Sequence, residues 1–214
     1  MTGPMRSVSA SMSLTAGLLA LSSSIAWAEK AAAPRVITCE RPFDRYSNHV
    51  DLVKAFRSNN VVYREVDGAA GQKIKASVLY PDDPKARLEF VWSDEKARRR
   101  PLLIKAKDQS AWTTTHGVRI GMPLAEVEQV NGKPFKLSGF DWDYGGRVTD
   151  WQGGALSKPQ RGGCTIAVEF VHPEDAPEAN LTKVTGDSEF LSDNADIRAV
   201  EPYVGAVTIS YPKR

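Results

Sequence analysis

Polar and apolar positions along the chain switch repeatedly between helical and strand spacing. The first helical stretch is SNHVDLVKAFRSNN, in which Ser47 or Asn48 can cap the start. Asn59-Asn60 can adopt the left-handed conformation that ends a helix. We therefore predict a short amphipathic helix near residues 48–57. The apolar residues of its expected buried face are Val50, Val53 and Phe56.

Alternating apolar residues follow this helix and predict a series of strands separated by turns. The turn signals lie at residues 68–71 and at the Pro-Asp-Asp-Pro sequence 81–84. A basic turn at residues 96–100 precedes one further strand. The predicted strands are 61–66, 73–80, 87–92 and 102–106.

The same order then returns later in the chain. Pro123 stands at a first helical position, and Asn131-Gly132 ends the helix predicted over 123–130. Strands are predicted at 135–144, 147–151 and 165–171, followed by a short helix capped by Ser192 and a last strand containing Val207 and Ile209. The pattern predicts an α+β fold of two similar helix-plus-antiparallel-meander modules, 43–110 and 111–214, together forming a single compact unit.

The sequence IGMPLAEVEQVNGKP has Gly-Met before a short helix and Asn-Gly-x-Pro after it. With the meander that follows, it resembles the module of β-lactamase inhibitor protein and of the small outer-membrane-assembly lipoproteins. The first of these carries the module twice. The wider string WTTTHGVRIGMPLAEVEQVNGKPFKLSGFDWDYGG also resembles an uncharacterised family of exported bacterial proteins. The resemblance implies a tandem-module fold and names no activity.

The first segment predicts export. Arg6 precedes an apolar run at residues 14–21 and the small-x-small sequence Ala26-Trp27-Ala28, as in a secretory signal peptide spanning residues 1–28. The run is shorter than the roughly 20 residues that a membrane span needs, so we expect no stable membrane insertion. Residues 29–42 read as an extended lead-in, and the exported protein is periplasmic or secreted.

Charge and cysteine content narrow the function further. Removing residues 1–28 takes away one Arg and no acid, so 28 Lys+Arg against 26 Asp+Glu becomes 27 against 26. This near-neutral balance argues against a nucleic-acid partner. The only cysteines, Cys39 and Cys164, are expected to form a disulfide in an oxidising compartment. The alternative is two separate thiols, buried or exposed.

The stretch GFDWDYGGRVTDW, residues 139–151, reads as a hairpin with Gly145-Gly146 as a two-residue loop. In that register one face is aromatic and the other acidic. The aromatic face contains Phe140, Trp142, Tyr144, Arg147, Thr149 and Trp151, and the acidic face contains Asp141, Asp143 and Asp150.

Each face of this hairpin has more than one interpretation. The aromatic residues either pack against the helix at 123–130 or bind a ligand. The three carboxylates repel one another, and this repulsion is relieved by water, by a basic partner protein or by a metal. Metal ranks below a protein partner because the chain has no Asp-rich calcium loop, and we expect no cofactor.

Common catalytic motifs are missing from the chain, including G-x-S-x-G and H-E-x-x-H. His49, His116 and His172 have no spacing that groups them on one metal. The leading hypothesis is an exported, non-catalytic binding or inhibitor-like protein acting on another envelope or extracellular protein, or a structural assembly factor. The alternative is a small envelope hydrolase that uses Asp141 with Asp143 or Asp150 on polysaccharide or peptidoglycan.

Overall fold

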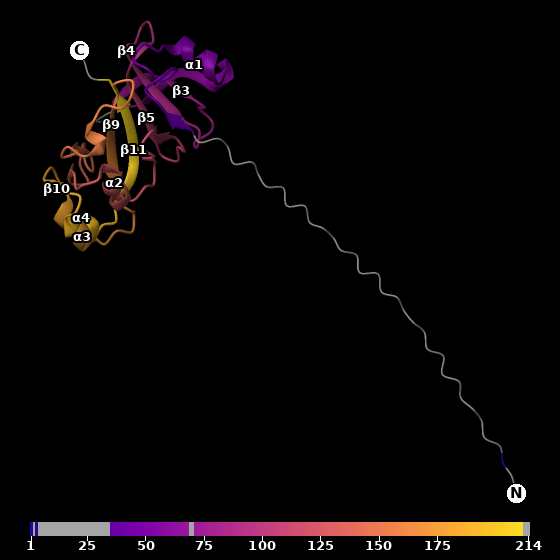
Figure 1. The fold of residues 1–214 in the computed structure, drawn as a ribbon, viewed down its shortest axis with the longest axis vertical. Helices are drawn as coiled ribbons and strands as arrows, with labels where there is room; N and C mark the ends of the chain where they lie inside the picture. The colour runs from indigo at the N-terminus through magenta and orange to yellow at the C-terminus, as the bar shows by residue number, and fades with distance from the viewer. Residues whose placement is uncertain (2, 4–34, 69–70, 212–214) are drawn as a thin grey trace. The chain divides into compact units, whose positions relative to one another are not determined.

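A six-stranded antiparallel sheet is the largest element of the computed structural model, which describes residues 1, 3, 35–68 and 71–211. The predicted signal peptide lies outside these residues, apart from Met1 and Gly3. The strand order is β2-β3-β4-β5-β11-β9 (Figure 1). The strands are β2 (Val61–Asp67), β3 (Lys73–Leu79), β4 (Leu88–Asp94), β5 (Arg99–Lys107), β9 (Thr165–Val171) and β11 (Tyr203–Ser210).

One face of this sheet carries the main hydrophobic core. Phe90 lies opposite Ile104, Ile104 opposite Ile209, and Ile209 opposite Ile166, so one row of apolar side chains crosses four strands. Three of these side chains are fully buried and Ile166 is 5% exposed. The strand alternation seen in the sequence therefore directs one set of residues into the core, as period-two patterning requires.

Two eight-residue helices, α1 (His49–Phe56) and α2 (Leu124–Asn131), contribute to this core. The Asn48 side chain accepts from the Asp51 N–H, and the Asp51 carboxylate accepts from the Asn48 N–H, which satisfies two free donors of α1. Gly132 ends α2 in the left-handed conformation with φ of 79°. The helical spacing thus indicated both elements correctly.

The face and the end of α1 differ from the prediction. Leu52 is the fully buried residue of α1, whereas Val50 is 55% exposed. The helix ends at Arg57, which has φ of 70°, and Asn59 and Asn60 form the short 3-10 helix η1 (Ser58–Asn60) instead of the stop. Leu52 thus takes the place predicted for Val50, whereas Val53 and Phe56 pack against the core as predicted.

The remaining elements lie mainly beside β9 and β11 (Figure 1). The helix expected after Ser192 is present as α4 (Ala195–Arg198), but Asn194 caps it. The Ser192 hydroxyl instead accepts from the Phe135 N–H and donates to the Glu128 carboxylate. The sequence did not indicate α3, β10 or the parallel pair of β1 and β6. The bounds are β1 (Val36–Ile37), β6 (Thr113–Thr114), β7 (Lys136–Ser138), β8 (Val148–Asp150), η3 (Ala155–Ser157), α3 (Glu178–Val184), β10 (Glu189–Leu191) and α4 (Ala195–Arg198).

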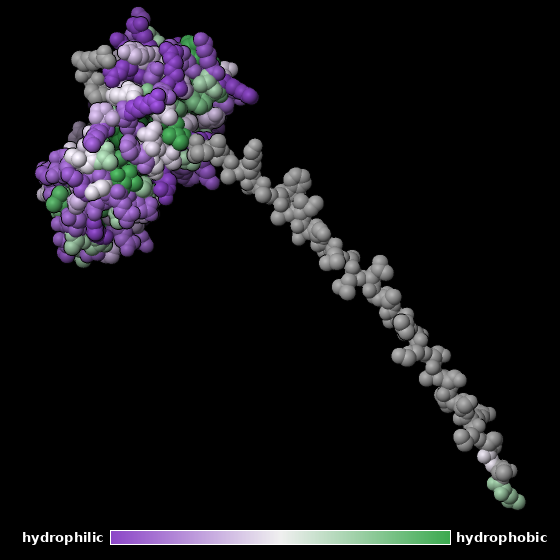
Figure 2. All heavy atoms as spheres, in the orientation of Figure 1, coloured by the Kyte–Doolittle hydropathy of each residue, from purple (hydrophilic) through white to green (hydrophobic). Residues whose placement is uncertain are grey.

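The surface of the folded unit is mostly hydrophilic on the face drawn in Figure 2, with hydrophobic residues in small separate groups. Among the residues that the structure describes, no helix has the length and apolar character needed to cross a membrane.

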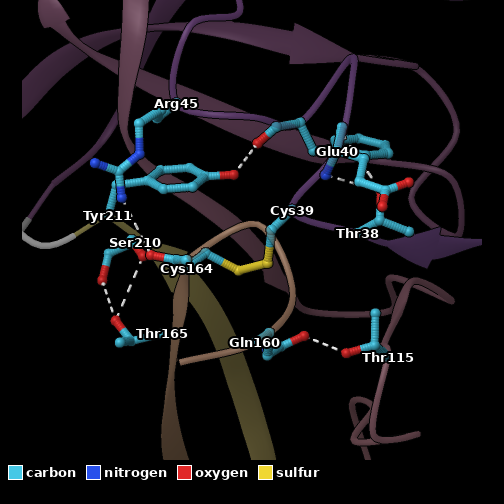
Figure 3. Close-up of a disulfide and its surroundings, with 12 residues drawn as sticks. Thr38, Cys39, Glu40, Arg45, Thr115, Gln160, Cys164, Thr165, Ser210 and Tyr211 are labelled. Atoms are coloured by element: carbon cyan, nitrogen blue, oxygen red, sulfur yellow. Dashed lines mark hydrogen bonds between the residues drawn. A yellow bond between two sulfur atoms is a disulfide. The ribbon is translucent and has the colours of Figure 1, made fainter. Parts of the chain in front are cut away.

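The predicted disulfide between Cys39 and Cys164 is confirmed, with the two Cα atoms 5.8 Å apart (Figure 3). It joins the segment before α1 to the start of β9. Close to it, the Arg45 guanidinium stacks 5.4 Å from the centre of the Tyr211 ring, and the Tyr211 hydroxyl bonds the Phe43 carbonyl. The disulfide therefore ties Cys39 to the start of β9, and the Tyr211 contacts tie Phe43 and Arg45 to the end of β11.

Removing this disulfide should destabilise the fold substantially. The bond closes a loop of 125 residues, and loop-closure entropy then predicts a loss of about 5 kcal/mol for the Cys39→Ser, Cys164→Ser double variant. Urea unfolding of parent and variant measures the difference, and reduction of the parent protein is the matching control. Equal unfolding midpoints for all three samples would show that the disulfide does not stabilise the fold.

Candidate functional site

Residues 139–147 form a loop, not the two-residue hairpin expected at Gly145-Gly146. Lys136 lies opposite Asp150 and Leu137 opposite Val148, so the paired part of β7 and β8 ends at Ser138. The expected register would have placed Asp141 opposite Asp150. The observed register puts a lysine there instead, which exchanges a repulsive pair for an attractive one. We call residues 139–147 the aromatic loop.

Internal hydrogen bonds hold the aromatic loop closed. The Ser138 hydroxyl donates to the Tyr144 carbonyl at 2.7 Å, and the Arg147 N–H donates back to the same hydroxyl at 3.2 Å. The Gly146 N–H donates to the Gly139 carbonyl at 2.9 Å. One serine side chain and two glycine backbones therefore fix both ends of the loop.

Gly146 fastens the loop to the edge of the large sheet. Its carbonyl accepts from the Phe170 N–H at 2.8 Å, and Arg147 forms a bridge with Glu169 on β9. A Cβ atom on Gly146 would lie 1.9 Å from the Phe170 carbonyl oxygen, and φ at Gly146 is +67°. Only glycine fits both the backbone conformation and this close approach.

The loop presents an exposed group of aromatic and cationic side chains. Trp142 and Tyr144 are 39% and 45% exposed, and their rings pack edge to face with centres 5.5 Å apart. The Arg147 guanidinium lies 5.3 Å from the centre of the Tyr144 ring. The Trp142 indole N–H donates to the Gly139 carbonyl at 3.1 Å. These side chains are thus held in place while their outer surfaces stay accessible.

Two other aromatic residues of the predicted face belong to the core. Phe140 is 2% exposed. Trp151 packs with its ring centre 5.1 Å from that of Phe135 and donates its indole N–H to the Ile166 carbonyl. The aromatic residues of this stretch are therefore divided between packing and the surface, because the chain turns at the loop instead of continuing as a strand.

The three carboxylates predicted to share a face have different surroundings. Asp141 bonds His172 at 3.0 Å and Thr185 at 3.4 Å. Asp150 accepts from both the backbone and side-chain amides of Gln152. Asp143 is exposed and lines an open groove. The structure does not bring them together on one strand face, since residues 141 and 143 lie in the loop.

The groove runs across the sheet face opposite the main core and has a volume of about 520 Å³. Asp143 and Arg147 of the aromatic loop stand at its β9 side, beside Glu169. Apolar side chains line the part over β3, β4 and β5. We call this surface the sheet groove, and its main lining residues are Ile74, Val91, Leu103, Lys105, Thr208 and Glu169.

A buried ion cluster lies within the sheet groove. Glu89 is 3% exposed, and its carboxylate lies 2.7 Å from the Arg87 guanidinium and 3.8 Å from the Lys107 ammonium. Lys105, directly opposite Glu89 on β5, also lines the groove. Arg87 and Lys107 balance the buried acid, and Glu89 and Lys105 make the middle of the groove lining polar.

The three histidines lie apart, and one of them contacts a serine. The His49 Nδ1 atom lies 2.8 Å from the Ser77 hydroxyl, which also accepts from the Trp92 indole N–H at 2.9 Å. Ser77 is fully buried, so no substrate reaches its hydroxyl and the pair is structural. His116 is exposed. Within residues 35–68 and 71–211, no group of three or more His, Cys, Asp or Glu is arranged to hold a metal ion.

Comparisons of the chain with family models, with curated proteins and with solved structures find no match. A function has to be inferred from the residues themselves.

Sequence reasoning identified the loop residues Trp142, Tyr144, Asp143 and Asp141 but missed the sheet groove. The groove combines residues from all six strands of the large sheet, and no local pattern records which strands are neighbours. The sequence feature that could have indicated the groove is the set of residues that alternate with the core residues along the strands, such as Glu89 between Leu88 and Phe90.

Changing Gly146 to alanine should disrupt the attachment of the loop to β9. Gly153→Ala is a matched control, because φ at Gly153 is +70° and nothing lies within 4 Å of an added Cβ. Both changes carry about 1 kcal/mol of left-handed strain. Gly146→Ala should lose roughly 1–3 kcal/mol more from the forced contact with Phe170. Chemical unfolding gives both values, and equal losses would contradict the close approach.

Acid should weaken the contribution of His49 to stability. Burial, and then the charge of Arg98, lower the pKa of His49 from 6.5. A lowered pKa means that the fold favours the neutral ring, so the contribution is complete above pH 6.5 and is lost as pH falls through the folded-state value. The difference in unfolding free energy between the parent and His49→Gln should therefore shrink in acid. A difference that grows in acid would reverse this assignment.

Proposed function

We propose that this chain is an exported, non-catalytic protein that binds or inhibits another envelope or extracellular protein through the aromatic loop and the sheet groove. The observation that carries this proposal is the exposed Trp142–Tyr144–Arg147 group, held by backbone hydrogen bonds at one end of an open groove. Tryptophan, tyrosine and arginine are the residues that contribute most often to the energy of protein interfaces. A preformed loop also loses little conformational entropy on binding.

The shape of the groove favours a protein partner over a small molecule. Its lining extends across the sheet from β2 to β9 and includes apolar, acidic and basic side chains. Small-molecule pockets are more enclosed and mostly apolar. A partner segment lying along the groove would meet Ile74 and Val91 at one side and the aromatic loop at the other.

The proposed partner carries a basic surface. Asp143 is exposed at the rim, and no ion pair or side-chain hydrogen bond involves its carboxylate among the described residues. A partner cation near Asp143 would also approach Glu169. Such contacts would increase the association rate and weaken as salt rises.

Export is part of the proposal. It is supported by the signal-peptide pattern of residues 1–28 and by the Cys39–Cys164 disulfide, which is favoured in oxidising compartments.

We also propose that the fold contains two related modules, as the resemblance to β-lactamase inhibitor protein implies. In support, α1 and α2 each precede antiparallel strands, and Leu52, Leu124 and Val127 belong to one hydrophobic core. The strands after α2 are divided between two sheets, so the second module is the more altered of the two.

The alternative hydrolase would need two free carboxylates facing one substrate. Asp141 and Asp150 are already engaged by His172 and Gln152, and no observation in the described part of the chain favours catalysis.

Replacing the exposed aromatic residues should weaken partner binding. We expect Trp142→Ala, Tyr144→Ala to lose at least about tenfold in affinity, since interface hot spots cost roughly 2 kcal/mol or more. The control, Tyr46→Ala with Val50→Ala, removes comparable exposed side chains away from the groove. Affinity capture from the native extract, at low and high salt, compares the proteins retained. If parent and loop variant retain the same proteins equally, the aromatic loop is not the binding surface.

A further inference from the structure

The two contacts of His172, with Asp141 and with Pro173, require a charged imidazole if both are to form at once. His172 Nδ1 lies 2.8 Å from the Pro173 carbonyl oxygen, and His172 Nε2 lies 3.0 Å from an Asp141 carboxylate oxygen. Both partners are acceptors only. A neutral imidazole has one N–H and so can donate to only one of them. Both contacts form together when the ring carries two protons.

This contact fixes the start of the aromatic loop. Asp141 has φ of 61°, a left-handed conformation that costs free energy outside glycine. Its carboxylate reaches His172 at the end of β9 and Thr185 after α3. The Thr185 hydroxyl has a single proton and lies closer to the Leu181 carbonyl, at 3.0 Å, than to Asp141. The imidazolium is therefore the main support of Asp141, and Trp142 is the next residue.

We propose that His172 is a pH-dependent clasp, which holds the aromatic loop most firmly when the imidazole is protonated and loosens it when the neutral ring loses the ion pair with Asp141 and one of its two hydrogen bonds. The consequence for partner binding rests on the function proposed above. The clasp itself is a property of the free protein.

The surroundings of His172 agree with this assignment. Burial lowers its pKa, but the hydrogen bonds to Asp141 and Pro173 and the Asp141 charge outweigh burial and leave the pKa raised above 6.5. The loop contributes the carboxylate of Asp141 and the Phe140 ring, whose centre is 5.7 Å from the imidazole. Glu174 and Asp175 follow Pro173 and are exposed. In the described residues, the ion pair of His172 is with Asp141.

The direction of the effect follows from the raised pKa. The stabilisation of the loop is complete below pH 6.5, the unfolded value, and is lost as pH rises through the folded-state value. Binding through Trp142 and Tyr144 should then be strongest in mildly acidic conditions.

Nuclear magnetic resonance of the protein without any partner tests the clasp. We expect the two ring nitrogens of His172 to titrate with a midpoint above 6.5, and the amide signals of residues 141–146 to shift with the same midpoint. Hydrogen exchange of these amides should become about tenfold faster above it, since a hydrogen bond to a charged group has this effect on an opening equilibrium. His172→Gln should remove the transition from the loop, and His116→Gln, at an exposed histidine, should leave it unchanged.

A His172 midpoint at or below 6.5, or loop amides that do not follow it, would overturn the proposal. Both readouts come from the parent protein, so they stay decisive if His172→Gln fails to fold. Capture from the native extract at pH 6 and pH 8.5 separates the two proposals. If the loop opens at high pH but the same proteins are still captured, the clasp does not regulate binding. If the loop titrates as expected but Trp142→Ala, Tyr144→Ala captures the same proteins as the parent, the proposed binding function is wrong and the clasp stands.

Discussion

The insertion of β11 between β5 and β9 is the constraint on which the rest of the structure depends. Without this strand, the four strands β2 to β5 and the strand β9 would have no hydrogen-bonded connection. Ile209 stands at the centre of this junction, opposite Ile104 on one side and Ile166 on the other. Ile104 and Ile209, roughly a hundred positions apart, are therefore neighbours in one row of the core, and pairings of such long sequence separation slow folding.

The candidate site depends on the same junction. β9 is held in place by β11, and the Phe170 backbone on β9 holds Gly146 of the aromatic loop. The loop in turn places Arg147 against Tyr144 and supports Trp142 through the Gly139 carbonyl. The exposed aromatic group is thus positioned by the sheet, although it belongs to none of its strands. Rigid support of this kind is what a binding loop requires.

Local patterns predicted the regular elements because their physical causes are local. The strand at 165–171 and the end of α2 at Gly132 follow from period-two alternation and from the conformational freedom of glycine. The aromatic loop was misread as a strand because Phe140, Trp142 and Tyr144 alternate. Its real conformation is decided by the contact of Gly146 with Phe170, 24 residues later, and sequence spacing carries no record of that contact. The pair of Asp141 and His172 is hidden for the same reason.

The free edge of the large sheet is β2, whose outer side pairs with no strand among residues 35–68 and 71–211. An exposed edge of seven residues invites pairing between two copies of the chain. Antiparallel pairing about a twofold axis over the whole length of β2 centres on Arg64, so the two Arg64 side chains would lie directly opposite each other. Glu65, beside it, would face Tyr63 and gain no ion pair. The charge at the middle of the strand therefore opposes self-association along β2.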